Sequence, residues 1–158
     1  GGGRCQKSFG HASAPPGYAA PMFTYRRGVR FEEVDAAGIV FFGNHPRFAH
    51  EAMEAFFGTL DGGYAALINE RRLGLPSVAL EVQYHAPLRY GDTLTIEVAC
   101  ARLGQRSADL TYRMVRVAGD SLIATVRQTV VMSNLDVMKS VDMPADVRAA
   151  LEAHLISP

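Results

Sequence analysis

The 158-residue chain has only two cysteines, Cys5 and Cys100, and they lie 95 positions apart. This number and spacing exclude a disulfide framework and a cysteine-based zinc site. No apolar run approaches the roughly 20 residues that a helix needs to cross a bilayer. The first 21 residues also lack the apolar segment of a signal peptide. These absences predict a cytoplasmic protein with no membrane partner.

An excess of charge of either sign is missing as well. Lys+Arg and Asp+Glu each number 16, and the formal net charge is zero. This balance excludes a general affinity for nucleic acid. Lysine itself is scarce, because Lys7 and Lys139 are the only two and the other 14 cations are arginines. Arginine suits bidentate contacts with phosphate or carboxylate, but a GC-rich genome would produce the same bias.

The composition and length indicate one globular domain. Hydrophobic residues make up 48% of the chain and charged residues 20%, and this length is sufficient to bury a core. Residues 1–21 are rich in Gly, Ala, Ser and Pro and show no periodicity, which predicts a disordered N-terminal extension. Met22 is then a candidate start of the natural protein, and the domain is expected over residues 22–158.

Apolar residues at a spacing of four predict a long helix after this point. Phe48, Ala52, Phe56 and Leu60 form a wide apolar stripe, which is typical of a helix packed against a sheet. The helix is expected to open near Asn44 or His45 and to end at the glycines after Phe57. A shorter helix is predicted over residues 64–72 and a last one from Pro144.

Alternating apolar and polar residues predict strands elsewhere. A first strand is expected over residues 23–31, interrupted by the polar segment 26–28. Four more are expected in the second half, over residues 78–84, 94–100, 110–114 and 122–132. Because the long helix must be covered, the simplest arrangement is a curved five-stranded antiparallel sheet around it. The predicted fold class is α+β.

Asp35 is the first candidate for chemistry. It is surrounded by small and apolar residues and lies just ahead of the predicted helix start, so we expect its carboxylate to be partly desolvated. Free N–H groups at a helix N-terminus can hold a developing negative charge. A carboxylate beside such a terminus is the minimum that acyl transfer to water requires. The structural alternative is that Asp35 only satisfies amides of its own loop.

Two sequence blocks carry a family resemblance. Residues 30–45 read RFEEVDAAGIVFFGNH, and residues 82–94 read VQYHAPLRYGDTL. The first resembles the signature of hot-dog-fold acyl-CoA thioesterases of the 4-hydroxybenzoyl-CoA thioesterase family, which also contains the Tol-Pal-associated thioesterases. The second is similar to that family's strand–turn–strand. The resemblance covers residues 24–150 and implies a hot-dog fold with the same order of elements.

The resemblance also implies the catalytic roles. Asp35 would act as general base or nucleophile, and the Phe42 backbone N–H, with Gly43 beside it, would polarise the thioester carbonyl. Phe42 stands where several Tol-Pal-type relatives have His, which favours the hydroxybenzoyl type. No cofactor or metal is expected beyond the coenzyme A of the substrate. The acyl group is left open between aromatic and short- or medium-chain.

Further residues are expected to bind the substrate. Phe41, Asn44, His45 and Phe48 would lie near the acyl group, although His45 could instead be a cap or packing residue. Arg106 and Ser107, in the turn 102–107, match in position the basic turn that contacts the nucleotide phosphates in hydroxybenzoyl relatives. A homo-oligomer, either a dimer or a tetramer with sites at the subunit interface, is expected as well.

Other readings of these residues remain open. A hydratase or dehydratase of the same fold would need an acid–histidine pair, which this loop does not offer. A non-catalytic acyl-CoA-binding module would have lost the chemistry, whereas Asp35 and Gly38 are present. Glu51 on the long helix could serve as the acid if Asp35 were inert. Of Glu32 and Glu33, at least one is expected to be a surface residue.

Overall fold

The computed structural model describes residues 22–156, so the extension predicted over residues 1–21 lies outside the described residues. The described part starts with a strand, continues with helices, and then forms the greater part of a sheet. In order, the elements are β1 (Phe23–Gly28), η1 (Phe31–Glu33), α1 (Asn44–Phe57), α2 (Gly63–Asn69), β2 (Leu73–Gly74), β3 (Ser77–Tyr84), β4 (Thr93–Leu103), β5 (Ser107–Arg116), η2 (Ala118–Asp120), β6 (Ser121–Val131), β7 (Ser133–Asn134), β8 (Lys139–Ser140) and α3 (Ala145–Glu152).

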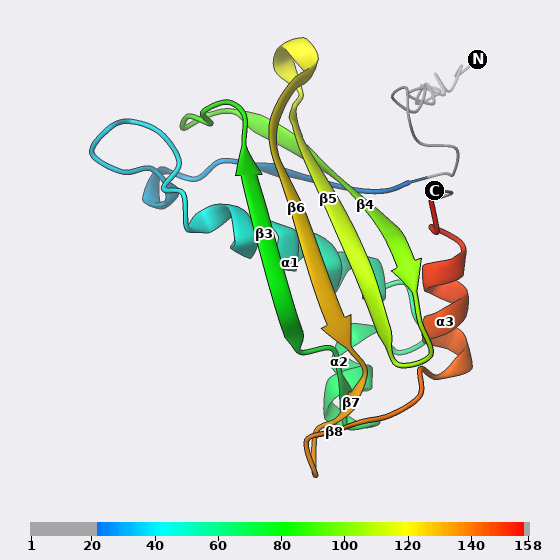
Figure 1. Ribbon diagram of the computed structural model, residues 1–158. Coiled ribbons are helices and arrows are strands. Elements are labelled where there is room, and N and C mark those ends of the chain that lie inside the picture. The colour runs from blue at the N-terminus through cyan, green and yellow to red at the C-terminus, as the bar shows by residue number, and fades with distance from the viewer. Residues whose placement is uncertain (1–21, 157–158) are drawn as a thin grey trace, which may run out of the picture.

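Five strands form one antiparallel sheet in the order β1-β4-β5-β6-β3 (Figure 1). The strands that the alternating pattern predicted are all present, and the α+β fold class is confirmed. The two-residue strands β2, β7 and β8 form a separate three-stranded sheet, which the sequence did not predict because two residues are too few to show a period.

Helix α1 lies along one face of the large sheet (Figure 1). Its apolar stripe is almost completely buried, at 3% exposure or less, and comprises Phe48, Ala49, Ala52, Met53, Phe56 and Phe57. The inward-facing side chains of the three central strands cover it, among them Leu94, Ile96, Leu110, Tyr112, Met114, Ala124 and Val126. Burial of each large side chain stabilises the fold by about 1.5–3 kcal/mol, so this layer holds α1 in place.

The ends of α1 agree with the prediction. The helix starts at Asn44, with Pro46 in its first turn where no N–H is needed, and Gly58 is its C-terminal cap. The second helix, Gly63–Asn69, is shorter than the predicted 64–72. The last helix follows Pro144 as expected.

The predicted interruption of the first strand is wrong. β1 continues through Arg27 without a break, because the Arg27 guanidinium is paired with the carboxylates of Glu33 and Glu51. A paired charge can occupy an inward-facing position that an unpaired one could not. Phe31, predicted to extend the strand, belongs instead to the short helix η1.

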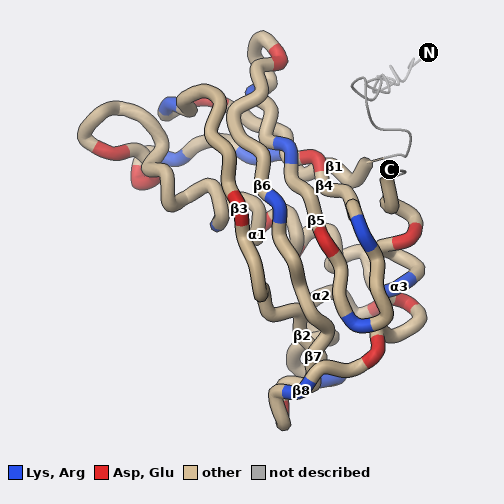
Figure 2. Tube along the Cα trace, viewed as in Figure 1, with Lys and Arg blue, Asp and Glu red and all other residues tan. Residues whose placement is uncertain are grey.

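Charged residues of both signs lie along β3, β5 and β6 (Figure 2). At one edge of the sheet, β3 has a neighbouring strand on one side only, as far as the described residues go. Val78, Leu80 and Tyr84 of this strand are 63%, 51% and 47% exposed. Within residues 22–156, no helix has the length and apolar character needed to span a membrane.

Candidate active site

Asp35 lies in a short closed loop between η1 and α1. The loop is closed by an isolated bridge between Val34 and Val40 and by the hydrogen bond from Asp35 N–H to the Ile39 carbonyl, at 2.9 Å. Gly38 turns the chain with a φ of +79°, a conformation that glycine adopts without a steric penalty. The loop therefore presents Asp35 at a defined place just ahead of α1.

The Asp35 carboxylate is largely open to solvent. Its Oδ1 accepts one hydrogen bond, from the Ala37 N–H at 2.9 Å, and the residue is exposed in the single chain. The expected partial desolvation is therefore wrong for the single chain. The bond to Ala37 is the loop contact anticipated by the structural alternative, but it uses only part of the acceptor capacity of a carboxylate.

The start of α1 offers two free N–H groups beside this loop. The Asn44 N–H bonds to the Phe41 carbonyl at 2.9 Å and starts the first turn. Among the described residues, the N–H groups of Phe42 and Gly43 have no hydrogen-bond partner. Unpaired N–H groups at the positive end of a helix can stabilise an oxyanion.

A buried ionic cluster supports the base of the loop. The Glu33 side chain is 1% exposed and accepts two hydrogen bonds from Arg27, at 2.9 and 2.5 Å. It accepts two more, from Arg47 at 2.6 Å and from the Arg30 N–H at 2.8 Å. Although burial alone would raise it, these bonds lower the pKa of Glu33 to about 2. Of the two glutamates, Glu32 is the surface residue and Glu33 is not.

The backbone of Glu33 connects this cluster to the helix start. Its carbonyl accepts hydrogen bonds from the Phe41 N–H and the Asn44 side-chain amide, both at 3.0 Å. The ends of the Asp35 loop and the first residue of α1 are thus tied to one buried carboxylate residue. Asn44, predicted to bind substrate, has this structural contact.

Glu51 also belongs to the ionic cluster. Its carboxylate pairs with Arg27 at 2.8 Å and with Arg47 at 3.1 Å, and the Tyr25 hydroxyl donates to it at 3.3 Å. Two guanidinium groups and a hydroxyl thus occupy acceptor sites of this carboxylate. These contacts give Glu51 a structural role in the ionic cluster.

The other predicted residues near the helix start divide into exposed and buried groups. Phe41 and Phe42 are 47% and 65% exposed, and their ring centroids lie 4.6 Å apart. Phe48 is completely buried, with the Arg27 guanidinium 4.0 Å from its ring centroid. His45 is 4% exposed and packs against Phe48. In the single chain, Phe48 and His45 are core residues, so of these residues only the exposed rings can contact a substrate directly.

Arg106 and Ser107 lie at the opposite end of the sheet from Asp35. The Asp35 loop is bonded to the chain near the start of β4, through Val40 N–H to the Leu88 carbonyl. Ser107 begins β5 beyond the other end of β4, whose 11 residues span about 35 Å. Arg106 is paired there with Asp142 at 2.8 Å. These residues cannot join Asp35 within one chain.

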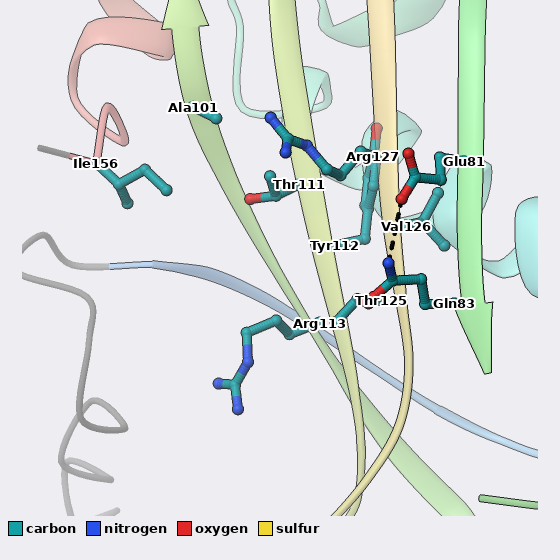
Figure 3. A pocket seen from close by; sticks show the side chains of 10 residues that line it. All are labelled: Glu81, Gln83, Ala101, Thr111, Tyr112, Arg113, Thr125, Val126, Arg127 and Ile156. Carbon is teal, nitrogen blue, oxygen red and sulfur yellow. Dashed lines mark hydrogen bonds between the residues drawn. The ribbon is translucent and has the colours of Figure 1, made fainter. Parts of the chain in front are cut away.

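A hollow of about 390 Å³ lies on the sheet face away from α1 (Figure 3). Figure 3 shows polar side chains around it, including Thr111, Thr125 and Arg127. None of the predicted site residues lines this hollow. Among residues 22–156, no group of three or more His, Cys, Asp or Glu side chains is arranged to hold a metal ion.

Sequence reasoning missed two features of the site, the buried ionic cluster and Tyr84. Arg27 shares the inward face of β1 with Tyr25, and an arginine on an inward face needs a carboxylate partner. That pattern could have revealed the cluster. The Tyr84 hydroxyl donates to the Phe42 carbonyl at 2.7 Å across 42 residues, and nothing in the local sequence indicates this contact.

Comparison with known proteins identifies the family of the chain. The profile of the thioesterase-like superfamily matches residues 29–151. A 1,4-dihydroxy-2-naphthoyl-CoA hydrolase of Trichodesmium erythraeum is 33% identical over 92 residues, which cover 58% of this chain and 67% of the relative. The enzyme of the same name from Thermosynechococcus vestitus is 33% identical over 100 residues, or 63% of this chain and 68% of the relative.

Solved structures share the fold. The gentisyl-coenzyme A thioesterase BH1999 is 28% identical and superposes with a TM-score of 0.72, covering 81% of this chain and 98% of that one. The 1,4-dihydroxy-2-naphthoyl-CoA thioesterase Slr0204 of Synechocystis, 24% identical, superposes with a TM-score of 0.75 over 83% of this chain and 96% of that one. The chain belongs to the thioesterase-like superfamily and has its hot-dog fold.

Proposed function

We propose that this chain hydrolyses an acyl-CoA thioester to a free acid and coenzyme A, with Asp35 as general base or nucleophile. One observation carries the proposal: an exposed carboxylate lies on a closed loop that leads directly into two unpaired N–H groups at the start of α1. This combination supplies both a group that activates or replaces water and a site for the oxyanion.

The reaction follows from these groups. In the general-base route, Asp35 takes a proton from water as the water oxygen attacks the thioester carbon. The carbonyl oxygen gains negative charge, which the Phe42 and Gly43 N–H groups stabilise, and the tetrahedral intermediate then expels the coenzyme A thiolate. In the nucleophilic route, the Asp35 carboxylate attacks the carbon, the C–S bond breaks and the coenzyme A thiolate leaves, which gives a mixed anhydride that water then hydrolyses to the free acid and the Asp35 carboxylate. Neither route calls for a cofactor besides the coenzyme A of the substrate.

An aromatic acyl group is the substrate class that the site favours. The exposed rings of Phe41 and Phe42 lie beside the unpaired N–H groups, and aromatic rings stack well on one another. The relatives named above act, by their names, on dihydroxynaphthoyl-CoA and gentisyl-CoA. We therefore propose a hydroxylated aromatic acyl-CoA ahead of short- or medium-chain esters.

A second copy of the chain would complete the site. Edge strand β3 has an unpaired backbone edge and exposed apolar side chains at Val78, Leu80 and Tyr84, and such edges favour pairing with another strand. Tyr84 contacts the helix start, so a second subunit paired along β3 would cover the space beside Phe42. Arg106 and Ser107 could reach the nucleotide of a bound substrate only from another subunit. We propose a homodimer as the minimum unit.

The cytoplasm is the location we propose, as the sequence predicts. Among residues 22–156, Cys100 is a free, buried thiol, as is common in proteins of reducing compartments.

The main alternative is a non-catalytic acyl-CoA-binding module. It predicts binding without turnover, whereas the proposed enzyme releases coenzyme A thiol. A hydratase or dehydratase would change the acyl group and leave the thioester intact.

One assay separates the three functions. Thiol release is followed with a chromogenic disulfide reagent for benzoyl-, 4-hydroxybenzoyl-, 1,4-dihydroxy-2-naphthoyl-, acetyl-, hexanoyl- and palmitoyl-CoA, and the acyl products are identified by mass spectrometry. We expect thiol release, fastest with the hydroxylated aromatic esters. Binding of these esters without thiol release would refute the proposal and favour the binding module. Faster hydrolysis of hexanoyl-CoA would refute the aromatic preference alone.

A further inference from the structure

Tyr84 makes a contact at the helix start that the proposed reaction has not used. It is the last residue of β3, and its hydroxyl donates a hydrogen bond of 2.7 Å to the Phe42 carbonyl. The direction is certain, since a carbonyl oxygen can only accept. The Tyr84 ring also packs edge-on against the His45 ring, with centroids 4.9 Å apart.

The Phe42 carbonyl has a second partner, the His45 ring. The His45 Nδ1 lies 3.2 Å from this oxygen, so Nδ1 carries the proton. His45 is 4% exposed, and burial lowers its pKa. The imidazole is therefore neutral at neutral pH and still donates from Nδ1, so this carbonyl accepts from two side chains at once.

These two bonds act on the Gly43 N–H, because it belongs to the same peptide unit as the Phe42 carbonyl. In a planar trans peptide the C=O and N–H bonds point in opposite directions. Holding the carbonyl against Tyr84 and His45 therefore fixes the N–H in the opposite direction, where it has no partner among the described residues. Hydrogen bonds to a carbonyl also polarise the peptide and strengthen its N–H as a donor.

We propose that Tyr84 is a positioning residue for thioester hydrolysis, with His45 as its companion. Its hydroxyl orients and polarises the Phe42–Gly43 peptide, and the Gly43 N–H transmits this effect to the oxyanion of the transition state. Tyr84 touches the Phe42 carbonyl and not the reacting atoms. The inference rests on the proposed thioesterase function. It gives β3 a role in catalysis within its own subunit, because Tyr84 and the Phe42–Gly43 peptide belong to the same chain.

Tyr84→Phe tests the proposal with little other change, because it removes the hydroxyl and keeps the ring against His45. Tyr90→Phe is the matched control: Tyr90 is also exposed, its ring packs against Phe31, and its hydroxyl has no hydrogen bond among the described residues. For Tyr84→Phe we expect kcat to fall about 3- to 10-fold, which corresponds to one hydrogen bond of ordinary net strength. KM should stay within about twofold, because the oxyanion exists only in the transition state. Tyr90→Phe should match the wild type.

A second measurement tests the peptide itself and needs no turnover. The backbone ¹⁵N resonance of Gly43 reports hydrogen bonding at the Phe42 carbonyl, and Tyr84→Phe should shift it upfield while Tyr90→Phe leaves it in place. A shift together with the loss of kcat supports the proposal. An unshifted Gly43 resonance, an unchanged kcat, or a raised KM with kcat unchanged would overturn it.

The two measurements also distinguish this proposal from the proposed function. If wild-type protein hydrolyses none of the thioesters, thioester hydrolysis fails, and the catalytic role of Tyr84 fails with it. The Gly43 shift would then still establish whether Tyr84 polarises the peptide. If the wild type is active and Tyr84→Phe is equally active, the proposed function stands and the role of Tyr84 is wrong.

Discussion

Replacing Glu33 with glutamine should destabilise the protein far more than the same change at the adjacent Glu32. Glu33 is buried and its carboxylate accepts four hydrogen bonds, from Arg27, Arg47 and the Arg30 N–H. Glu32 is 75% exposed and lies 3.9 Å from Arg30. A buried ion pair that loses one partner leaves an uncompensated charge, whereas an exposed pair contributes little.

The magnitude follows from the pKa of Glu33. A pKa of about 2 in the folded protein, against an ordinary 4.5, corresponds to on the order of 3 kcal/mol at 1.36 kcal/mol per pKa unit. Glu33→Gln should therefore lower the free energy of unfolding at pH 7 by about 3 kcal/mol, and the melting temperature by roughly 10 °C. Glu32→Gln should change the unfolding free energy by less than about 0.5 kcal/mol.

The pH dependence gives a second check, and its sign is fixed. Because folding lowers the pKa of Glu33, its contribution is complete above the unfolded-state pKa near 4.5 and is lost as the pH falls through the folded-state pKa of about 2. At pH 3 the lowered pKa of Glu33 should still contribute about 1.5 kcal/mol to the free energy of unfolding, about half of its contribution at pH 7. The gap in stability between wild type and Glu33→Gln should shrink accordingly.

Urea unfolding followed by circular dichroism at pH 7 and pH 3 measures both quantities. The wild type and the two glutamine variants are compared at equal protein concentration, because association through β3 would affect the midpoint. Equal midpoints for the two variants at pH 7 would refute the reasoning. If the difference in unfolding free energy between the wild type and Glu33→Gln were as large at pH 3 as at pH 7, the lowered pKa of Glu33 would be refuted.

Three further predictions concern the core, the loop and the buried thiol. Phe56→Ala should cost about 3–5 kcal/mol of unfolding free energy in urea, because Phe56 is 2% exposed between α1 and the sheet; a cost below about 1 kcal/mol would contradict the packing. Gly38→Ala should cost about 1 kcal/mol from its φ of +79° alone, since no atom lies within 4 Å of the added methyl group, and Gly28→Ala, at an ordinary φ, is the control that should cost nothing. In a Cys5→Ser variant, Cys100 should react with iodoacetamide at pH 8 at least about 100-fold more slowly in the folded than in the urea-unfolded protein, because burial raises its pKa from 9.0 to about 11; equal rates would show that the thiol is accessible.

The sequence predicted those parts of the fold that local periodicity determines. The four-residue spacing from Phe48 to Phe56 specifies α1, and the alternation in β3 to β6 specifies strands with one buried face. The spacing of apolar residues is linked directly to burial, because one face of each helix or strand is buried in the core. The start of α1, expected at Asn44 or His45 because Pro46 suits a first turn, lies at Asn44.

The sequence failed where contacts between distant residues decide the outcome. Arg27 looked like a break in a strand, because its partners Glu33 and Glu51 come from η1 and α1. Phe48 belongs to the apolar stripe, and the pattern alone does not show whether such a residue lines a substrate pocket or lies in the core. In the single chain it lies in the core, with the Arg27 guanidinium over its ring. The sequence also could not show that Arg106 lies far from Asp35 in the same chain, a separation that the length of β4 sets; its expected contact with the nucleotide stays a prediction.

Asp35→Asn tests the central claim most directly. The substitution keeps the size of the side chain and its hydrogen bond from the Ala37 N–H but removes the charge that activates water or attacks the carbonyl. Asp61→Asn, in the exposed turn after α1, is the matched control, and urea unfolding verifies that both variants are folded. With the best ester of the panel, we predict that Asp35→Asn lowers kcat by about 10²–10⁴ and that Asp61→Asn leaves it unchanged. A folded Asp35→Asn variant that hydrolyses the ester at the wild-type rate would contradict the account.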